Sequence, residues 1–170
     1  MEIRPLGEDD AQTYWKLRME ALQTEPFAFG RAPEEHQAAG VAEIVRRFRE
    51  PHERSFTLGA FEGGELIGTA TFVRDTSVKG RHKGNIYGVY VTASQRGRGI
   101  GGALIGALLK KAASDPSLEQ FVLAAAVQQK AAGQLYRKFG FECFGTQPRA
   151  LKVGSEYVDE EHMLLQLAKP

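Results

Sequence analysis

The sequence predicts a single mixed α/β (α+β) domain, in which a central mixed sheet of about six to seven strands is flanked by about four helices. Two observations predict this fold class. Segments rich in β-branched and aromatic residues fill the middle of the chain and are separated by turn residues, which is typical of an antiparallel meander. After residue 96 a glycine-opened helix, a short apolar strand and a second helix follow, which is typical of a βαβα unit.

The first third of the chain predicts one short strand and two helices. A strand is expected over residues 2–6, followed by a helix that ends at residues 25–26, where a proline follows glutamate. A second helix is expected to begin at Pro33, to be interrupted at Gly40 and to stop at Pro51. Each helix carries apolar residues at helical spacing. These residues are Tyr14, Leu17, Ala21 and Leu22 in the first helix, and Val41, Ile44, Val45 and Phe48 in the second.

The middle of the chain predicts three antiparallel strands. The glycine pair Gly63 and Gly64 is a hairpin signal between the first two, and a polar loop precedes the third. The expected strands cover residues 55–61, 65–74 and 85–92.

The last part of the chain predicts alternating helices and strands. An Asp-Pro pair at residues 115–116 breaks the first helix, and Gly140 caps the second. The helices are expected over residues 97–114 and 130–139. The strands are expected over residues 121–127, 141–144 and 156–167, with a loop between the last two.

Length, charge and cysteine content limit the classes of function. The 170 residues, which we treat as one domain spanning 1–170, carry 22 basic and 21 acidic residues, a balance that argues against a nucleic-acid partner. The sequence has no apolar run long enough for a bilayer and no signal-peptide core, so we expect no membrane partner and a cytoplasmic location. Its one cysteine, Cys143, is expected to be a buried small side chain. The four histidines show no metal-ligand spacing, so no metal is expected, and His36 and His52 are expected at the surface.

A glycine-rich turn at residues 96–102 opens one of the predicted helices. Glycines let the backbone approach an anion without an intervening Cβ, and the free N–H groups of a first helical turn favour phosphate. Arg96 and Arg98 add positive charge. The alternative is a surface turn with a packing role. We favour phosphate binding, because each glycine inside a helix costs about 1 kcal/mol relative to alanine.

The class of phosphate ligand depends on the sequence around this turn. Gly97-x-Gly99-x-x-Gly102 satisfies the dinucleotide fingerprint. However, an antiparallel meander precedes it, and the acid expected after the next strand is missing at residues 128–129. A Walker A loop is excluded because Ala103 and Leu104 occupy the positions of its Lys and Ser/Thr.

Two motifs in the correct order resemble those of the GNAT acetyltransferase superfamily. Arg96-x-x-Gly99-x-Gly101, which follows residues 89–91, resembles motif A of that family. Ala132-x-x-Leu135-Tyr136-x-x-x-Gly140-Phe141 resembles motif B. The resemblance covers essentially the whole chain and implies a GNAT-like mixed sheet. It also implies an acyl-CoA-dependent N-acyltransferase, with acetyl transfer from acetyl-CoA to a primary amine by direct attack on the thioester as the favoured interpretation.

The resemblance also implies roles for individual residues. Tyr136 would be the catalytic residue that protonates the departing thiolate, and its alternative is a core tyrosine. The strand at residues 89–91 would pair with the pantetheine arm, and the N–H near Val91 would polarise the thioester carbonyl. Gln129 stands where the family commonly carries Asn, and Gln128 could replace it. The implied contacts of acetyl-CoA or coenzyme A are Val89, Tyr90, Val91, Arg96, Gly97, Arg98, Gly99, Ile100, Gly101, Gly102, Gln129, Ala132 and Tyr136.

The acceptor side of the reaction is less defined. Family members often place a Glu on the strand before motif A, and this chain has none there. The base would come from elsewhere, act through water or be unnecessary for an amine of low pKa. The candidate bases are Glu20, Asp75, His82, Asp159 and His162, and the alternative for each is a solvated or structural residue. The candidate lining residues of the acceptor site are Trp15, Phe27, Phe29 and Tyr157, with core packing preferred for Trp15 and Phe29.

The acceptor would be a small-molecule or protein amine, and the resemblance is compatible with a homodimer. A non-catalytic acyl-CoA-binding or interaction module is the alternative function. A dinucleotide-binding protein ranks below both.

Overall fold

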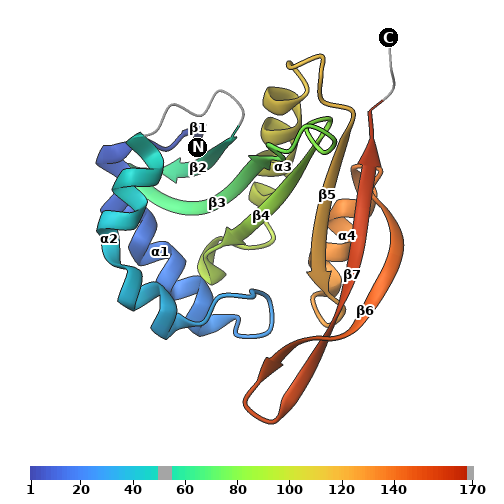
Figure 1. The fold of residues 1–170 in the computed structure, drawn as a ribbon. Helices are drawn as coiled ribbons and strands as arrows, with labels where there is room; N and C mark the ends of the chain where they lie inside the picture. Colours follow the sequence, from blue (N-terminus) through green and yellow to red (C-terminus); the bar gives the residue numbers. More distant parts are fainter. Residues whose placement is uncertain (50–54, 168–170) are drawn as a thin grey trace.

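A computed structural model describes residues 1–49 and 55–167, and over these residues it contains one seven-stranded sheet with helices on both faces (Figure 1). The strand order is β1-β2-β3-β4-β5-β7-β6. The predicted fold class, a mixed sheet flanked by helices, is confirmed. The elements are β1 (Glu2–Pro5), η1 (Glu8–Asp10), α1 (Ala11–Thr24), α2 (Pro33–Arg49), β2 (Ser55–Glu62), β3 (Glu65–Arg74), β4 (Lys83–Val91), η2 (Ala93–Gln95), α3 (Ile100–Ala112), β5 (Gln120–Ala126), α4 (Lys130–Lys138), β6 (Glu142–Val153) and β7 (Glu156–Gln166).

The antiparallel part of the sheet forms as the sequence predicts. Gly63 and Gly64 have φ angles of 58° and 85°, the left-handed conformation that a two-residue hairpin turn requires. The strand β4 begins two residues earlier than expected, because Gly84 pairs with Arg74 and extends the β3–β4 ladder. β4 then pairs with β5 in parallel, and β7 pairs with β5 and β6 in antiparallel fashion.

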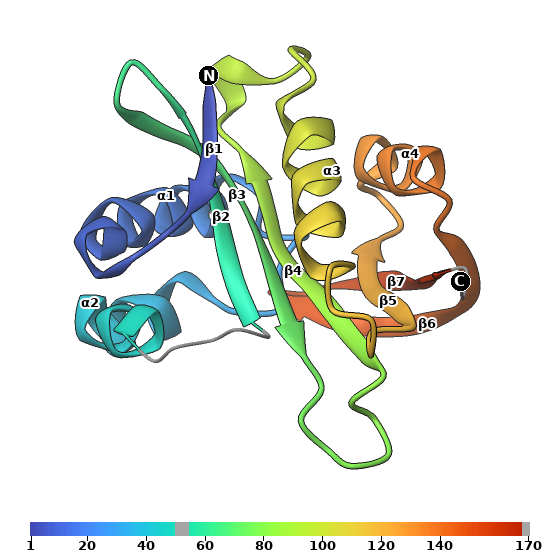
Figure 2. The same cartoon turned by 90° about the horizontal axis from the view of Figure 1, so that it is seen from above.

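The two faces of the sheet carry separate hydrophobic cores (Figure 2). One core lies under α1 and α2, where the predicted face of α1 is buried and Ile44 of α2 is 4% exposed. The other core lies under α3 and α4 and includes buried side chains of β2, β3, β4 and β5. Gly40 interrupts α2 with a φ of 67°, as expected. No helix in the described residues is long and apolar enough to cross a membrane.

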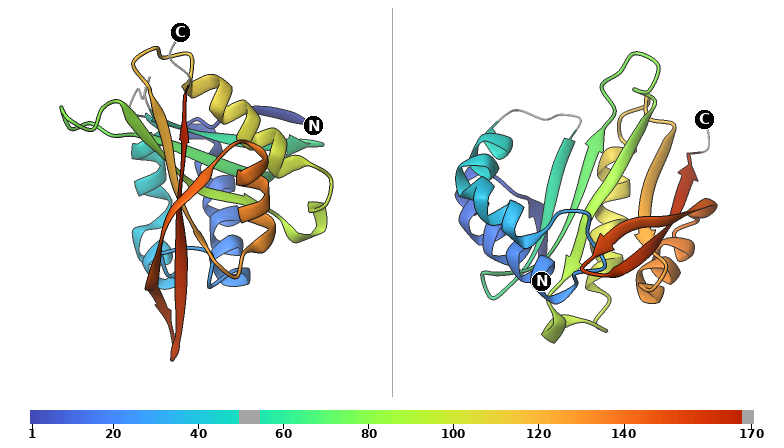
Figure 3. Two further views of the ribbon diagram at one scale, coloured as in Figure 1. Left: turned by 90° about the vertical axis from the view of Figure 1, so that its right-hand side faces the viewer. Right: turned by 60° about the horizontal axis from the view of Figure 1, so that its bottom comes forward.

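The end of the chain differs from the prediction. The expected strand over residues 141–144 is the start of a much longer strand, β6, which reaches Val153 and turns at Gly154. Pro148 fits this strand because β6 is the edge of the sheet and its pairing with β7 is irregular between Gln147 and Leu151. The resulting β6–β7 hairpin extends beyond the other strands (Figures 1 and 3).

Two side chains lie where the sequence did not predict them. His36, expected at the surface, is buried, because its ring stacks on Trp15 and its Nε2 lies 3.0 Å from the Trp15 carbonyl oxygen. Cys143, expected to be buried, is exposed, because it lies on the edge strand β6. Pro51 and His52 lie outside the described residues.

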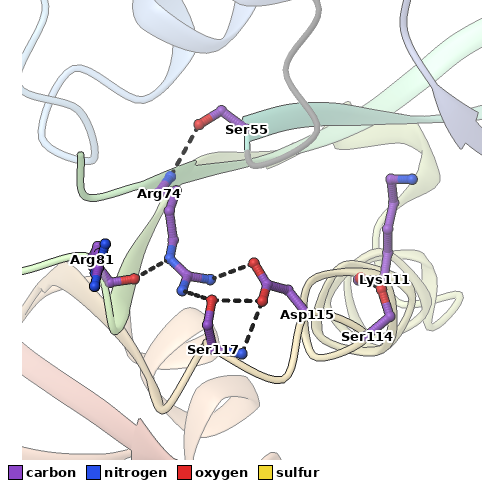
Figure 4. A network of polar contacts seen from close by, with 7 residues as sticks. All are labelled: Ser55, Arg74, Arg81, Lys111, Ser114, Asp115 and Ser117. Carbon is purple, nitrogen blue, oxygen red and sulfur yellow. Dashed lines mark hydrogen bonds and ion pairs between the residues drawn. The ribbon is translucent and has the colours of Figure 1, made fainter.

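A buried arginine joins the end of β3 to the loop after α3 (Figure 4). Arg74 is 3% exposed, and its Nη2 donates to Ser117 Oγ at 2.9 Å, while Nη1 lies 3.4 Å from Asp115 Oδ2. Its Nε donates to the carbonyl oxygen of Arg81. A buried charge is tolerated only when it is paired and hydrogen-bonded, so this network fixes the β3–β4 loop against the α3–β5 loop.

Replacing Arg74 with methionine is therefore expected to lower the free energy of unfolding by about 1–2 kcal/mol, because the hydrogen bonds of its guanidinium group to Ser117, Asp115 and the Arg81 carbonyl oxygen are lost. Arg46→Met on the exposed face of α2 is the matched control, with an expected change of less than about 0.5 kcal/mol. Urea unfolding followed by circular dichroism measures both. Equal stability of the two variants would show that the network does not stabilise the fold.

Candidate active site

The strands β4 and β5 separate towards their C-terminal ends (Figure 1). Their parallel pairing is limited to three residue pairs, the last of which is Asn85 with Val122. β4 continues to Val91 and β5 continues to Ala126 beyond that point. The backbone of β4 after Asn85 is therefore available on this side to an extended ligand, which could pair with it as an added strand.

The glycine-rich turn follows directly at the end of β4 and η2. Gly97 and Gly99 have φ angles of 77° and 79°, and a Cβ added to either would meet no atom within 4 Å. Gly99 is the N-cap of α3, and Ala103 N donates to its carbonyl oxygen at 3.0 Å. Among the residues described, no protein acceptor takes the N–H groups of residues 97–102. The turn thus presents open space and free donors at a helix N-terminus, which is the arrangement that binds phosphate.

The glycines of this segment divide into two groups. A Cβ on Gly101 would lie 3.4 Å from Leu135 of α4, and one on Gly102 would lie 3.7 Å from the same side chain. These two glycines therefore face the neighbouring helix, while Gly97 and Gly99 face open space. The packing role that the sequence offered as an alternative applies to Gly101 and Gly102, although their N–H groups remain at the first turn of α3.

The two arginines of the turn are not free cations. Arg98 forms a bidentate ion pair with Glu62 of the β2–β3 hairpin, at 2.7 and 2.8 Å. Arg96 donates through Nε to the Val91 carbonyl oxygen at 3.0 Å and through Nη1 to Glu25 at 2.7 Å. Both guanidinium groups position the turn in this structure, so the backbone donors are the groups that face the open space.

Glu25, at the end of α1, connects the two predicted motifs. One carboxylate oxygen accepts from Arg96, and the other accepts from Gln129 Nε2 at 3.0 Å. Burial would raise the pKa of Glu25, but the hydrogen bonds from Arg96 and Gln129 outweigh it and lower the pKa below its usual value. The sequence predicts that the first helix ends at Glu25, and no local pattern could have revealed these two distant partners.

Replacing Glu25 with alanine is expected to cost about 1 kcal/mol of stability at neutral pH, because two hydrogen bonds to one carboxylate are lost. The lowered pKa means that the ionised carboxylate stabilises the fold at neutral pH, and this contribution disappears as the pH falls through that pKa. The difference between wild type and variant should therefore shrink in acid. Urea unfolding at several pH values measures it, with exposed Glu34→Ala as the control. A pH-independent difference would contradict the role of the charge.

Tyr136 lies on α4 and belongs to the hydrophobic core under α3 and α4. It is 6% exposed, and its ring packs edge to face with Phe141 at 6.0 Å between centroids. Burial raises the pKa of Tyr136 to about 12, so the phenol keeps its proton throughout the physiological range. Ala132, one turn earlier on α4, is half-buried against the same core.

Of the candidate bases, Glu20 lies at the C-terminal end of β4. Its Oε1 accepts from Tyr90 Oη at 2.8 Å and from Thr92 Oγ1 at 2.5 Å. Burial raises the pKa of Tyr90, and the hydrogen bond to Glu20 adds to this effect while the one to Thr24 opposes it.

Of the other candidate bases, two lie at the opposite end of β4 and two lie on β7, beside β5. His82 directly precedes Lys83 at the start of β4, and the Asp75 N–H donates to the Lys83 carbonyl oxygen. This end of β4 lies on the order of 25 Å from Val91 along the strand. Asp159 and His162 lie on β7, where Asp159 accepts from the Arg149 N–H at 2.7 Å and His162 Nε2 lies 3.2 Å from Gln147 Oε1.

The aromatic candidates for the acceptor site lie in different parts of the structure. Phe29 packs against Tyr90 at 6.4 Å, and Trp15 stacks on His36 at 5.4 Å, as the preferred packing role predicts. Tyr157 is exposed on the β6–β7 hairpin, beneath the cations of Arg149 and Lys152. Phe27 is half-buried in the turn after α1. Within the described part of the chain, no group of three His, Cys, Asp or Glu residues could hold a metal ion.

Comparisons with known proteins agree with this geometry. The model of the acetyltransferase (GNAT) family matches residues 11–141. A sequence comparison with curated proteins found no match. Similar solved structures include a putative acetyltransferase from Salmonella typhimurium with its cofactor acetyl-CoA. The TM-score is 0.86 at 21% identity, over 100% of this chain and 95% of that chain.

Two further structures are similar over nearly the whole chain. The phosphinothricin acetyltransferase from Sinorhizobium meliloti, in complex with acetyl-CoA, has a TM-score of 0.85 at 20% identity, over 98% of this chain and 88% of that chain. The ribosomal-protein-alanine N-acetyltransferase from Brucella melitensis has a TM-score of 0.80 at 22% identity, over 98% and 100%. These identities establish a shared fold and leave the acceptor undefined.

Proposed function

Because this chain belongs to the GNAT acetyltransferase family, we propose that it is a single-domain N-acetyltransferase that transfers an acetyl group from acetyl-CoA to a primary amine. The proposal is supported by two features that follow one another along the chain. The unpaired edge of β4 runs directly into a turn with free N–H groups and open space before it. One elongated molecule with a peptide-like arm and a pyrophosphate would use both, and coenzyme A has these parts.

The residues of the chain would share the binding of acetyl-CoA. The N–H groups of residues 97–102 would hold the pyrophosphate, and the backbone of residues 89–91 would pair with the pantetheine arm. Gln129, at the start of α4, donates a hydrogen bond from its side chain to Glu25. This side chain would border the pantetheine arm and need not make the contact that Asn commonly makes at this position in the family. Acetyl-CoA supplies the activated acetyl thioester.

The chain's own groups would then position the amine and move protons. The Val91 N–H would donate to the thioester carbonyl oxygen, and Tyr136 Oη would give its proton to the departing sulfur. Glu20 is the candidate base whose carboxylate reaches β4, and it would accept a proton from the amine directly or through water. No covalent enzyme intermediate is needed, so positioning supplies much of the rate.

A non-catalytic acyl-CoA-binding module is the second candidate. Two observations favour it: β4 carries no acidic residue, and the Gln129 amide is engaged by Glu25. Hydrolysis of acetyl-CoA that no amine accelerates would support this alternative, whereas amine-dependent release of coenzyme A would support the enzyme.

Ligand-dependent stabilisation tests the donor side. Saturating acetyl-CoA is expected to raise the Tm by several degrees, because a ligand that binds only the native state stabilises it by about 3 kcal/mol at a hundred times its Kd. NADH at the same concentration is the control and should leave the Tm unchanged. A shift with NADH and none with acetyl-CoA would overturn the proposal in favour of a dinucleotide-binding protein.

A further inference from the structure

A basic cavity lies between α1, α2 and the face of β3 and β4 that these helices cover. Its volume is about 240 Å³, and three arginines line it together with Tyr87 and Gly88 of β4. The arginines are Arg18 of α1, Arg31 of the α1–α2 loop and Arg47 of α2. A single liquid water takes about 30 Å³, so the cavity has room for a polar group of appreciable size.

Arg18 supplies the strongest indication of a ligand. Its Nη1 is buried and has no hydrogen-bond partner among the described residues, and its guanidinium carbon lies 4.3 Å from the centroid of the Phe29 ring. A buried donor without an acceptor costs free energy, and a cationic donor costs more than a neutral one. Burial is the main cause of the lowered pKa of Arg18. The cation–π contact with Phe29 helps to hold the guanidinium group at the cavity, where its Nη1 can donate to an acceptor.

The carboxylate that lines the cavity is already paired with an arginine other than Arg18. Glu43 is the one carboxylate among the lining residues, and Arg31 binds it at 3.0 and 3.2 Å. Burial lowers the pKa of His36, so its imidazole is neutral at physiological pH and adds no charge. Arg18 therefore has no carboxylate partner among the residues that line the cavity.

The cavity adjoins the strand on which acetyl transfer is proposed. A Cβ on Gly88 would lie 3.7 Å from Arg18 Nη1, so this guanidinium group faces the backbone of β4. Gly88 precedes Val91 by three residues, which corresponds to roughly 10 Å along a strand. An acceptor that places one end against Arg18 can therefore direct its other end towards the C-terminal end of β4.

We propose that this cavity binds an oxyanion of the acceptor, so that the preferred acceptors are primary amines that also carry a carboxylate or a phosphoryl group. A planar guanidinium matches both groups with paired N–H donors. The cavity determines acceptor specificity, and it does not bind acetyl-CoA. This inference rests on the proposed acetyltransferase activity and concerns only its acceptor.

The test compares matched acceptors with wild-type enzyme. Amino acids whose amine and carboxylate are separated by three to five methylene groups are paired with their carboxamides, and phosphoethanolamine is paired with ethanolamine. The oxyanion-bearing member of at least one pair is expected to have a kcat/KM about 100-fold higher, because an unpaired buried cation is costly to leave without its anion. The pair that shows the difference identifies carboxylate or phosphoryl as the group recognised. Equal kcat/KM values within both pairs would overturn the inference.

An Arg18→Gln variant and its control, Arg46→Gln on the exposed face of α2, extend the test. Arg18→Gln should abolish the preference within each pair, whereas Arg46→Gln should retain it. Inorganic phosphate gives a readout that needs no acceptor, provided that saturating coenzyme A already occupies the turn at residues 97–102. At constant ionic strength it should then raise the Tm of wild type and Arg46→Gln and not that of Arg18→Gln. Equal phosphate shifts in all three proteins would contradict an oxyanion site at Arg18.

The acetyl-CoA-induced Tm shift distinguishes a failure of the proposed acetyltransferase function from a failure of the proposed oxyanion site. It should persist in Arg18→Gln, because Arg18 lies on the acceptor side. Its absence in wild type would contradict the proposed function itself. An acetyl-CoA-induced Tm shift in wild type, together with equal kcat/KM values for amines with and without an oxyanion, would contradict only the assignment of the cavity.

Discussion

A Gly99→Val variant is expected to bind acetyl-CoA at least about 100-fold more weakly than wild type, a loss of roughly 3 kcal/mol. Gly99 is the N-cap of α3 with a φ of 79°, and a side chain there would project into space that no protein atom occupies. A branched side chain would occupy the position proposed for the pyrophosphate and would disfavour the turn that presents the N–H groups. Isothermal titration with acetyl-CoA measures the affinity.

The control for backbone strain is Gly154→Val. Gly154 also has a positive φ, 60°, and open space around its Cβ position, but it lies in the β6–β7 turn. Both variants are expected to lose about 1–2 kcal/mol of stability from the left-handed conformation, and only Gly99→Val should lose acetyl-CoA binding. Normal binding by Gly99→Val would remove the turn from the donor site.

A Tyr136→Phe variant is expected to lower kcat by about 100-fold and to leave the KM for acetyl-CoA nearly unchanged. The ring, and with it the packing against Phe141, is retained, so only the proton donor is lost. Because the pKa of Tyr136 is raised to about 12, wild-type kcat should show no decrease from ionisation of this phenol as the pH rises to 10. Steady-state kinetics across this pH range measures both effects.

Phe141→Leu is the packing control for Tyr136. It disturbs the same aromatic contact and is expected to cost about 1–2 kcal/mol of stability, while kcat falls much less than in Tyr136→Phe. If Tyr136→Phe kept wild-type kcat, Tyr136 would be a core residue only, the alternative that its burial also supports.

The sequence predicts the parts of the fold that local chemistry determines. Gly63 and Gly64 specify a hairpin, the apolar stripe of α1 specifies its buried face, and Gly140, with a φ of 88°, caps α4 as expected. The full length of β6 was missed because Pro148 and polar neighbours are typical of loops, and only the position at the sheet edge lets a strand accept them. The exposure of Cys143 follows from the same edge position.

The candidate site was predictable where it depends on the backbone and not where it depends on distant partners. The glycine turn and the strand before it are contiguous in sequence, so their spacing predicted an anion site. The pairing of Arg96 with Glu25, and of Arg98 with Glu62, joins residues far apart in the chain. Arg18 did carry a local signal: it follows Tyr14 by four residues, which places a cation beside the buried face of α1.

The central claim is that this chain catalyses amine-dependent acetyl transfer, and the release of coenzyme A from acetyl-CoA in the presence of a panel of primary amines tests it most directly. The panel should include amino acids, aminoalkyl phosphates, polyamines, amino sugars and peptides with free N-termini. At least one class of amine is expected to accelerate thiol release well above the rate without amine. One molecule of N-acetylated product should form per thiol released, which mass spectrometry measures. Thiol release that proceeds at the same slow rate with every amine, by a protein that nevertheless binds acetyl-CoA, would contradict it.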